Sequence, residues 1–301
     1  MQFGAHLPLI VFDGAPPSLA DLTAYAQRAA ALDFRYLCVN DHLLFGRPWL
    51  DGPTALAATL DASAGMTLAT TVALPVIRGP VQTAKLLSAL QLLSGGRLIA
   101  GVGPGSSRND YAAAGVPFDE RWKRFDESVR ALRSLLDEDA DSFAGRFYST
   151  EGVTIEPRPA GPPIWIASWG SAARLRQVAR LGDGWLASGY NTTPAAFRAN
   201  LDALPAAFPN AIATMWLYVT ESRRSRERVL ADVLAPALNR PLEALADLPL
   251  LIGSAEQCAE RLSAYAAAGA QRVFVWPLAD ELRQLEAFRH DVAPLVAGEA
   301  A

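Results

Sequence analysis

Segments with strand and helix patterns alternate along the whole chain of 301 residues. Short apolar runs of the kind that form buried strands cover residues 3–10, 36–40, 66–74, 97–102, 164–167, 185–188, 211–220 and 272–276. Most of these runs are followed by a segment in which apolar side chains recur every three or four residues, as on the buried face of a helix. About eight strand–helix units in one chain predict an α/β fold of the (β/α)8, or TIM, barrel class.

The alternative α/β topology is a doubly wound open sheet, which carries a G-x-G fingerprint directly after its first strand. Here the first predicted strand leads into Phe12-Asp13-Gly14-Ala15-Pro16-Pro17, which is not that fingerprint. The sequence has no low-complexity linker, so we expect residues 1–301 to form a single domain. Residues 142–163 and 223–250 exceed a minimal connection, and we expect them to be insertions at the C-terminal face and candidates for lids.

Charge and composition narrow the class of partner. The formal net charge is −4, so the chain offers no electrostatic reason to bind nucleic acid or an anionic membrane. No window of about 18 uninterrupted apolar residues could span a bilayer, and the first residues have a strand pattern rather than that of a signal peptide. Cys38 and Cys258 do not suggest a disulfide framework, which favours a reducing, cytoplasmic setting.

Catalytic residues of a (β/α)8 barrel lie at the carboxyl ends of its strands. Asn40-Asp41-His42 falls at the end of the second predicted strand, and His42 is one of three histidines in the chain. A histidine can act as general acid or base near neutral pH, and an adjacent carboxylate can orient its ring. We therefore predict His42 and Asp41 as catalytic residues; the alternative is that both cap the following loop.

Two further strand ends carry candidate ligand-binding loops. Gly103-Pro104-Gly105-Ser106 follows the fourth strand, and its glycines let the backbone approach a ligand and turn amides toward anionic oxygens. Ser168-Trp169-Gly170-Ser171 joins the fifth strand to a helix, whose N-terminal amides and serine hydroxyls suit a phosphate. The alternatives are a tight turn and plain helix capping by Ser171. The sequence contains no metal-binding motif, so we predict no metal site.

Taken together, these segments resemble the bacterial-luciferase-like flavin monooxygenase superfamily, and most closely its branch that uses the deazaflavin coenzyme F420. The resemblance extends over nearly the whole chain. The motifs that carry it are Ala31-Leu32-Asp33-Phe34, Asn40-Asp41-His42-Leu43, Leu93-Ser94-Gly95-Gly96-Arg97, Gly101-Val102-Gly103-Pro104-Gly105, Gly115-Val116-Pro117-Phe118-Asp119-Glu120-Arg121, Pro162-Pro163-Ile164-Trp165-Ile166, Leu181-Gly182-Asp183-Gly184-Trp185 and Ile252-Gly253-Ser254-Ala255-Glu256.

The resemblance implies a (β/α)8 barrel with the coenzyme at its C-terminal mouth and a homodimer, because members of the family are often dimers. It implies that His42 and Asp41 lie near the reactive ring, with a non-prolyl cis peptide at Thr71–Val72 behind it. The residues that would line the ring or its side chain are Gly103, Gly105 and Ser106. The residues that would hold the phosphate are Ser168, Trp169, Gly170 and Ser171.

Two positions depart from the family pattern. Some deazaflavin dehydrogenases have a glutamate where this chain has Ser106, and its absence argues against oxidation of a sugar phosphate. Trp169 is bulky for a position that often holds a small residue.

Three hypotheses for the function follow. The first is an F420-dependent oxidoreductase that transfers a hydride between the deazaflavin and a small organic substrate, while His42 exchanges a proton with a substrate alcohol. The second is an FMN-dependent monooxygenase, which needs a closing lid to protect its oxygen adduct. The third is a non-catalytic flavin-binding barrel, in which Trp169 or the insertions fill the substrate pocket. We favour the first.

Overall fold

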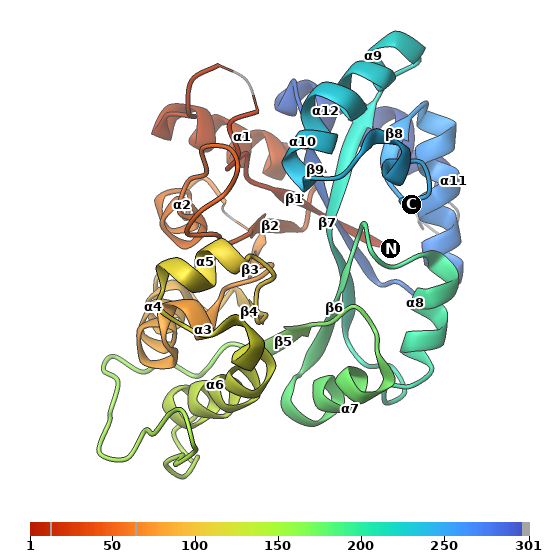
Figure 1. Cartoon of the computed structure of the whole chain (residues 1–301). Helices are drawn as coiled ribbons and strands as arrows, with labels where there is room; N and C mark the ends of the chain where they lie inside the picture. Colours follow the sequence, from red (N-terminus) through yellow and green to blue (C-terminus); the bar gives the residue numbers. More distant parts are fainter. Residues whose placement is uncertain (13, 64, 297–301) are drawn as a thin grey trace.

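Eight parallel strands close into a barrel in the computed structural model, which describes residues 1–12, 14–63 and 65–296 (Figure 1). The strands pair in the order β6-β5-β4-β3-β2-β1-β9-β7, and pairing of β6 with β7 closes the ring. This arrangement confirms the predicted (β/α)8 class. The barrel strands are β1 (Gln2–His6), β2 (Tyr36–Val39), β3 (Thr67–Thr70), β4 (Leu98–Val102), β5 (Ile164–Ala167), β6 (Gly184–Ser188), β7 (Asn210–Val219) and β9 (Arg272–Pro277).

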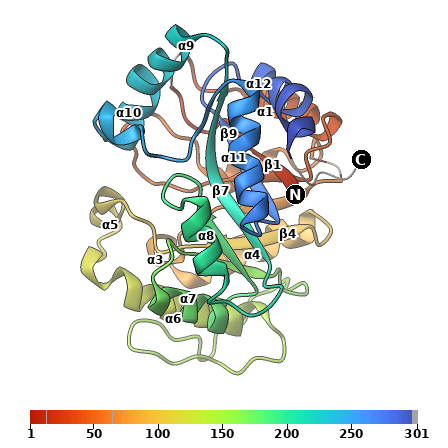
Figure 2. The ribbon, with the colours of Figure 1, turned by 90° about the vertical axis from the view of Figure 1, so that its right-hand side faces the viewer.

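Helices surround the barrel and connect its strands (Figures 1 and 2). No helix in the described ranges is long and apolar enough to cross a membrane. The α-helices are α1 (Leu19–Ala31), α2 (Gly52–Ala58), α3 (Pro75–Arg78), α4 (Pro80–Leu93), α5 (Arg108–Ala113), α6 (Arg121–Leu136), α7 (Ala172–Leu181), α8 (Pro194–Leu201), α9 (Arg223–Arg228), α10 (Ala235–Leu238), α11 (Ala255–Ala267) and α12 (Glu281–Ala287). The shorter 3-10 and π turns are η1 (Phe118–Glu120), η2 (Val229–Leu234), η3 (Leu242–Leu245), η4 (Phe288–Val292) and η5 (Ala293–Leu295).

Side-chain capping fixes where several helices begin. Ser18 and Ser254 each form a capping box, in which the serine hydroxyl accepts from the backbone N–H three residues later and that residue's side chain accepts from the serine N–H. The spacing Ser18–Asp21 and Ser254–Gln257 is visible in the sequence. The starts of α1 and α11 are therefore local properties of the chain.

The sequence does not predict β8 (Leu251–Gly253), a strand of three residues outside the barrel ring. The long strand β7 pairs with β6 through its first half and with β8 through residues 217–219. A run of three residues is too short for a periodic pattern to reveal it. β8 therefore arises from the length of β7, whose second half extends beyond β6 and offers a free edge.

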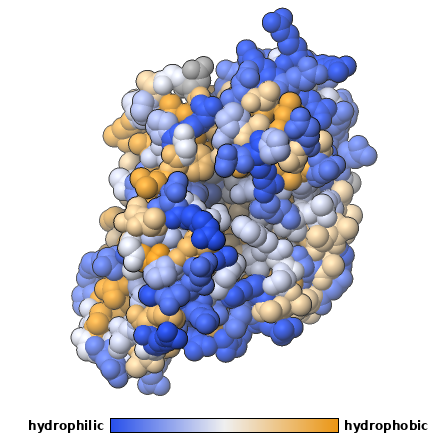
Figure 3. Space-filling view, in the orientation of Figure 1, coloured by the Kyte–Doolittle hydropathy of each residue, from blue (hydrophilic) through white to orange (hydrophobic). Residues whose placement is uncertain are grey.

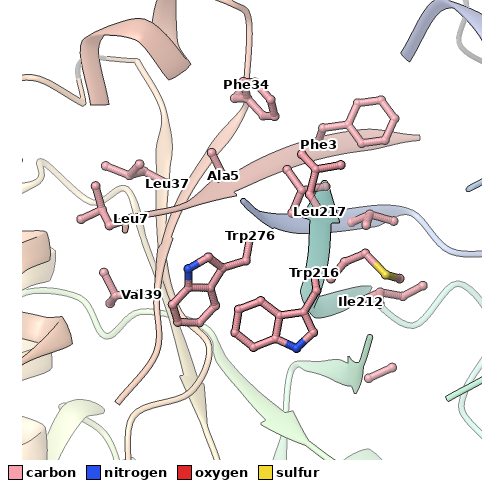
Figure 4. Packing of buried hydrophobic residues seen from close by; sticks show 14 of the residues in the cluster. Phe3, Ala5, Leu7, Phe34, Leu37, Val39, Ile212, Trp216, Leu217 and Trp276 are labelled. Atoms are coloured by element: carbon pink, nitrogen blue, oxygen red, sulfur yellow. The ribbon is translucent and has the colours of Figure 1, made fainter. Parts of the chain in front are cut away.

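The amino end of the barrel is occupied by side chains. Apolar residues inside the ring include Cys38, Ala69 and Phe274, and at the strand starts the Arg272 Nε donates to the Tyr36 hydroxyl at 2.7 Å. A second, larger group of buried apolar residues packs between the strands and the helices and extends to Trp216 and Trp276 at the barrel mouth, and Figure 4 shows part of it around β1, β7 and β9. Packing of this kind leaves the carboxyl end as the place for a binding site.

The two long connections lie on different sides of the molecule. Residues 142–163 lead from α6 to the start of β5, and Phe147 N–H donates to Glu127 on the surface of α6 at 2.7 Å. Residues 223–250 follow the carboxyl end of β7. Figures 1 and 2 show the first segment at the bottom of the molecule and the second at the top. Residues 223–250 therefore begin at the carboxyl end of a barrel strand, whereas residues 142–163 lead into the amino end of one.

Candidate active site

A cavity of about 370 Å³ opens at the carboxyl ends of the strands from β2 to β7. Its volume falls within the roughly 300–1,000 Å³ of small-molecule sites. Figure 3 shows this face of the molecule hollowed near its centre. Gly170 and Ser171 are not among the described residues that line the cavity. The predicted site residues that do line it are Asp41, His42, Thr71, Val72, Gly103, Gly105, Ser106, Ser168 and Trp169.

His42 is held by a carboxylate that the sequence analysis did not identify. Its Nδ1 lies 2.8 Å from Oδ2 of Asp110 in α5, and the other carboxylate oxygen accepts from the Leu44 N–H at 2.8 Å. Asp110 is almost fully buried and sits in the first turn of a helix capped by Ser107. In the neutral imidazole Nδ1 then donates to Asp110, which leaves Nε2 as the atom that can accept a proton.

Asp41 does not orient His42, although the two residues are adjacent in sequence. Its carboxylate accepts two hydrogen bonds of 2.7 Å from the guanidinium of Arg78, and its Oδ2 also accepts from the Leu74 N–H. Arg78 forms a second ion pair with Asp51. The hydrogen bond to Asp41 raises the pKa of Arg78 above its ordinary value, so the guanidinium stays charged. The expectation that Asp41 positions the histidine is wrong, because Arg78 competes for it.

The floor of the cavity is formed where β3 and β4 end. The peptide between Thr71 and Val72 is cis, as the resemblance implies, and the Val72 N–H donates to the Asn40 side chain at 3.1 Å. A Cβ atom on Gly103 would lie 2.7 Å from the side chain of Val72, so only glycine allows this approach. The result is a shallow apolar surface against which a flat ring can lie.

His6 lies beneath this floor and supports it. The ring is fully buried and stacked on Trp276 with a centroid distance of 4.6 Å. Its Nε2 accepts from the Thr214 N–H at 3.3 Å and lies 3.3 Å from the Thr71 hydroxyl, and both threonines line the cavity. Burial lowers the pKa of His6 to about 3. This histidine is therefore neutral near pH 7 and acts as a structural acceptor.

Aromatic rings fill the mouth of the barrel next to His42, on the side of β1 and β9. Ring centroids lie 4.7 Å apart for His42 and Trp49, 5.5 Å for Trp49 and Trp276, and 4.9 Å for Trp276 and Trp216. Figure 4 shows Trp216 and Trp276 side by side. Phe45 contacts both His42 and Trp49. His42 thus stands between an open cavity and a packed aromatic wall.

The residues of the predicted phosphate loop after β5 have different roles in the structure. Ser168 lines the cavity, and its hydroxyl accepts from the Gly170 N–H at 3.3 Å. Ser171 is the N-cap of α7, with its hydroxyl accepting from the Arg174 N–H, which agrees with the capping alternative. The Trp169 side chain is 59% exposed at the rim of the cavity. We therefore expect at most the first part of this loop to reach a ligand in the cavity.

Among the described residues that line the cavity, Arg121 is the single arginine or lysine. It begins α6, lies 4.0 Å from the centre of the Phe118 ring, and donates to the Phe118 carbonyl at 3.1 Å. Within the described ranges no ion pair joins it to a carboxylate, in contrast to Arg124, which binds Glu120, and Arg174, which binds Asp126. In the sequence, Arg121 is noted only as the last residue of a family motif. Its lack of a carboxylate partner in the described ranges becomes visible only in the folded structure.

The fold and the site define a (β/α)8-barrel protein with a cavity of small-molecule size at its C-terminal mouth. Sequence comparison narrows this class. Residues 1–272 match the model of the luciferase-like monooxygenase family, and the chain belongs to that family.

Curated relatives are similar to this chain in sequence, and a solved structure is similar in fold. The chain is 35% identical over 180 residues to an F420-dependent glucose-6-phosphate dehydrogenase of Intrasporangium calvum, covering 55% of this chain and 53% of the relative. It is 31% identical over 177 residues to an F420-dependent hydroxymycolic acid dehydrogenase of Mycobacterium tuberculosis, covering 55% and 48%. In these matches the chain spans about half the length of the relatives. An F420-dependent secondary alcohol dehydrogenase structure superposes with a TM-score of 0.83 at 16% identity, covering 98% of each chain, and shows the same fold.

Proposed function

We propose that this protein is an F420-dependent oxidoreductase that transfers a hydride between the deazaflavin and an alcohol or carbonyl compound. The observation that carries the proposal is the pair of His42 and Asp110 at the edge of the cavity, with a distance of 2.8 Å between Nδ1 and the carboxylate. The names of the two curated relatives point to the same coenzyme. The proposed catalytic residue is His42, with Asp110 as its positioning residue in place of Asp41.

The cavity suits such a coenzyme. Val72 and Gly103 provide a close-packed apolar surface for a flat ring, and Thr71 and Ser168 are polar residues of the same lining. Arg121 provides one positive charge for the anionic side chain of the coenzyme. The remaining predicted contacts, Gly105, Ser106 and Trp169, lie on the same cavity wall or rim. When bound, the deazaflavin supplies reversible hydride transfer.

The task of His42 is to hold and move one proton. Its Nε2 accepts the hydroxyl proton when an alcohol is oxidised and returns that proton when a carbonyl is reduced. The Asp110 carboxylate keeps the ring in one orientation and stabilises the imidazolium that forms. Trp49 and Phe45 pack against the ring on its other side and limit its rotation.

Side-by-side titration of the purified protein with F420 and with FMN, followed by fluorescence, tests the proposal. We expect F420 to bind at micromolar concentration or below and FMN to bind more weakly. A preference for FMN would support the monooxygenase alternative, and binding of neither would overturn the coenzyme assignment.

Arg121→Gln should weaken F420 binding roughly tenfold or more, since a charge-assisted hydrogen bond is worth about 1.5–3 kcal/mol. Arg180→Gln, on an exposed face of α7, is the matched control.

A cytoplasmic location and a homodimer complete the proposal. Cys38 and Cys258 are buried, free thiols, as expected in a reducing compartment. Leu92 and Leu93 at the end of α4 are 50% and 67% exposed and are candidates for a subunit contact. Sedimentation equilibrium of the wild type and of Leu93→Glu would measure the oligomeric state, with a dimer expected only for the wild type if this surface forms the contact.

A further inference from the structure

Thr214 has a backbone conformation that its own side chain makes unfavourable. Its φ angle is +59°, in the left-handed region that a residue branched at Cβ rarely adopts. The residue lies in β7, where the register against β9 shifts between Ile212 and Met215, as at a β-bulge. Bulges redirect a side chain from the regular alternation of a strand and are common beside active sites. Backbone strain of this kind is concentrated at functional sites.

The neighbouring residues hold this conformation through contacts with the Thr214 backbone. Its N–H donates to Nε2 of the buried His6 at 3.3 Å. Gly189 approaches so closely that a Cβ atom on it would lie 2.9 Å from the Thr214 carbonyl oxygen. A glycine at position 214 could make both contacts without strain, because neither involves the threonine side chain. The backbone contacts therefore do not require a threonine here.

The Thr214 side chain presents an unused hydroxyl group to the cavity. The buried serine and threonine residues that line the cavity are Thr71, Ser168 and Thr214. The Thr71 hydroxyl donates to the Val39 carbonyl at 3.2 Å, and the Ser168 hydroxyl accepts from the Gly170 N–H at 3.3 Å. Within residues 1–12, 14–63 and 65–296, the Thr214 hydroxyl makes no hydrogen bond and is not among the unpartnered polar atoms that are closed off from solvent. It is therefore accessible from the cavity.

Thr214 lies next to the floor of the cavity. The Nε2 atom of His6 that accepts from the Thr214 N–H is also 3.3 Å from the Thr71 hydroxyl, and Thr71 precedes the cis peptide to Val72. Val72 and Gly103 form the apolar surface for a flat ring. A ring that rests on this surface presents its edge, rather than its face, to Thr214.

We propose that the Thr214 hydroxyl binds the polar edge of the coenzyme ring and fixes the ring in its plane. The inference rests on the proposed function for the presence of such a ring. Deazaflavin and flavin rings share an edge of two carbonyl groups and one N–H, and a hydroxyl group can donate to the former or accept from the latter. The strained conformation at position 214 thus presents a hydroxyl group that glycine would lack.

Fluorescence titration with riboflavin, FMN and F420 tests this assignment, because riboflavin has the ring edge but no phosphate. Thr214→Val keeps the branched shape and loses the hydroxyl. It should raise the Kd of all three ligands about three- to tenfold, the loss expected for one neutral hydrogen bond. Thr214→Ser should remain within about twofold of the wild type. Arg121→Gln should weaken FMN and F420 but not riboflavin. Thr23→Val, on α1 and outside the cavity lining, is the matched control.

Thermal unfolding tests the strain separately from binding. Thr214→Gly removes the hydroxyl and also the penalty for a branched side chain at a φ angle of +59°. We expect its melting temperature to rise by about 2 °C, while its Kd for riboflavin rises as much as in Thr214→Val. Thr214→Val should melt within about 1 °C of the wild type. A Thr214→Gly protein less stable than the wild type would overturn the strain from which the proposal starts.

The outcomes separate this proposal from the proposed function. Weaker binding of all three ligands by Thr214→Val, with Thr214→Ser unaffected, supports the proposal whichever coenzyme the wild type prefers. Wild-type affinities in Thr214→Val, or equal losses in Thr214→Val and Thr214→Ser, overturn it and leave a preference for F420 intact. A preference for FMN together with the loss in Thr214→Val overturns the proposed function and retains the role of Thr214. If the wild type binds none of the three ligands, both proposals are wrong.

Discussion

The mouth of the barrel consists of two unlike halves. From β2 to the first half of β7, the strand ends surround an open cavity of about 370 Å³. Beside β1 and β9 the rings of Trp49, Trp216 and Trp276 occupy the mouth, with neighbouring centroids no more than 5.5 Å apart. His42 lies at the boundary and touches both. The difference indicates that one half is built for a ligand and the other as a wall that fixes the position of the histidine.

Replacement of His42 tests the boundary most directly. We expect His42→Asn to lower kcat by roughly 10²–10⁴-fold, because a positioned general acid or base contributes that much. The affinity for F420 should change little. Steady-state kinetics and a coenzyme titration measure the two effects. His290→Asn, on the exposed surface of η4, is the control and should leave kcat unaltered. A His42→Asn enzyme with wild-type kcat would remove the histidine from the chemistry.

Removal of an aromatic ring should affect the packed half through stability. Trp276 is 1% exposed and contacts His6, Trp49 and Trp216, so Trp276→Ala should lower the free energy of unfolding by about 3–5 kcal/mol. Trp169→Ala, at the open rim, should change it by about 0.5 kcal/mol or less. Denaturant unfolding of both variants measures the contrast. Equal losses would show that the two halves do not differ in packing.

The carboxylate beside His42 should matter to catalysis more than its sequence neighbour does. A hydrogen bond to a charged group is worth about 1.5–3 kcal/mol, so Asp110→Asn should lower kcat roughly 10- to 100-fold with little change in KM. Asp41→Asn breaks the ion pair with Arg78, so its main effect should be a lower melting temperature rather than a lower kcat. Comparing kcat, KM and the melting temperature of the two variants separates positioning from scaffolding. A larger fall in kcat for Asp41→Asn at equal stability would reverse the assignment.

The buried His6 predicts a pH dependence of stability. Burial lowers the pKa of His6 to about 3. Below about pH 6.5 the imidazole therefore binds a proton in the unfolded chain but not in the folded protein. Stability is therefore fully present above that pH and is lost as the pH falls, by up to about 1.4 kcal/mol per pH unit from this group. His6→Gln, which retains an acceptor for Thr214, should flatten the profile between pH 6.5 and 4. Parallel profiles for the two proteins would contradict this role.

Much of the barrel fold could be predicted from the sequence, because the patterns that specify its strands and helices are local. Alternating strand and helix patterns place all eight barrel strands, and capping boxes at Ser18 and Ser254 mark two helix starts. Strand ends point to most of the cavity, including His42, Gly103 and Ser168. The cis peptide at Thr71–Val72 follows from the family resemblance rather than from any local pattern.

The hydrogen-bond partners of the site side chains could not be predicted from the sequence, because they belong to distant segments of the chain. His42 and Asp110 are 68 positions apart, and the contact depends on how the loop after β2 packs on α5. Because Asp41 is next to His42 in the sequence, the sequence favours Asp41 as the partner of the histidine. In the structure the Asp41 carboxylate instead accepts two hydrogen bonds from Arg78. The free charge of Arg121 is likewise a result of which arginines find carboxylates in the folded chain.

By itself, the sequence determined the barrel, the end of the barrel at which the cavity opens, and the residue types available there, since short-range periodicity and strand order specify these. Tertiary structure alone decided which carboxylate holds His42, that residues 142–163 lie away from the cavity, and that tryptophans fill one half of the mouth. The physical reason is that hydrogen bonds and ring packing act over a few ångströms in space, and the distances between side chains arise only when remote segments are brought together by folding.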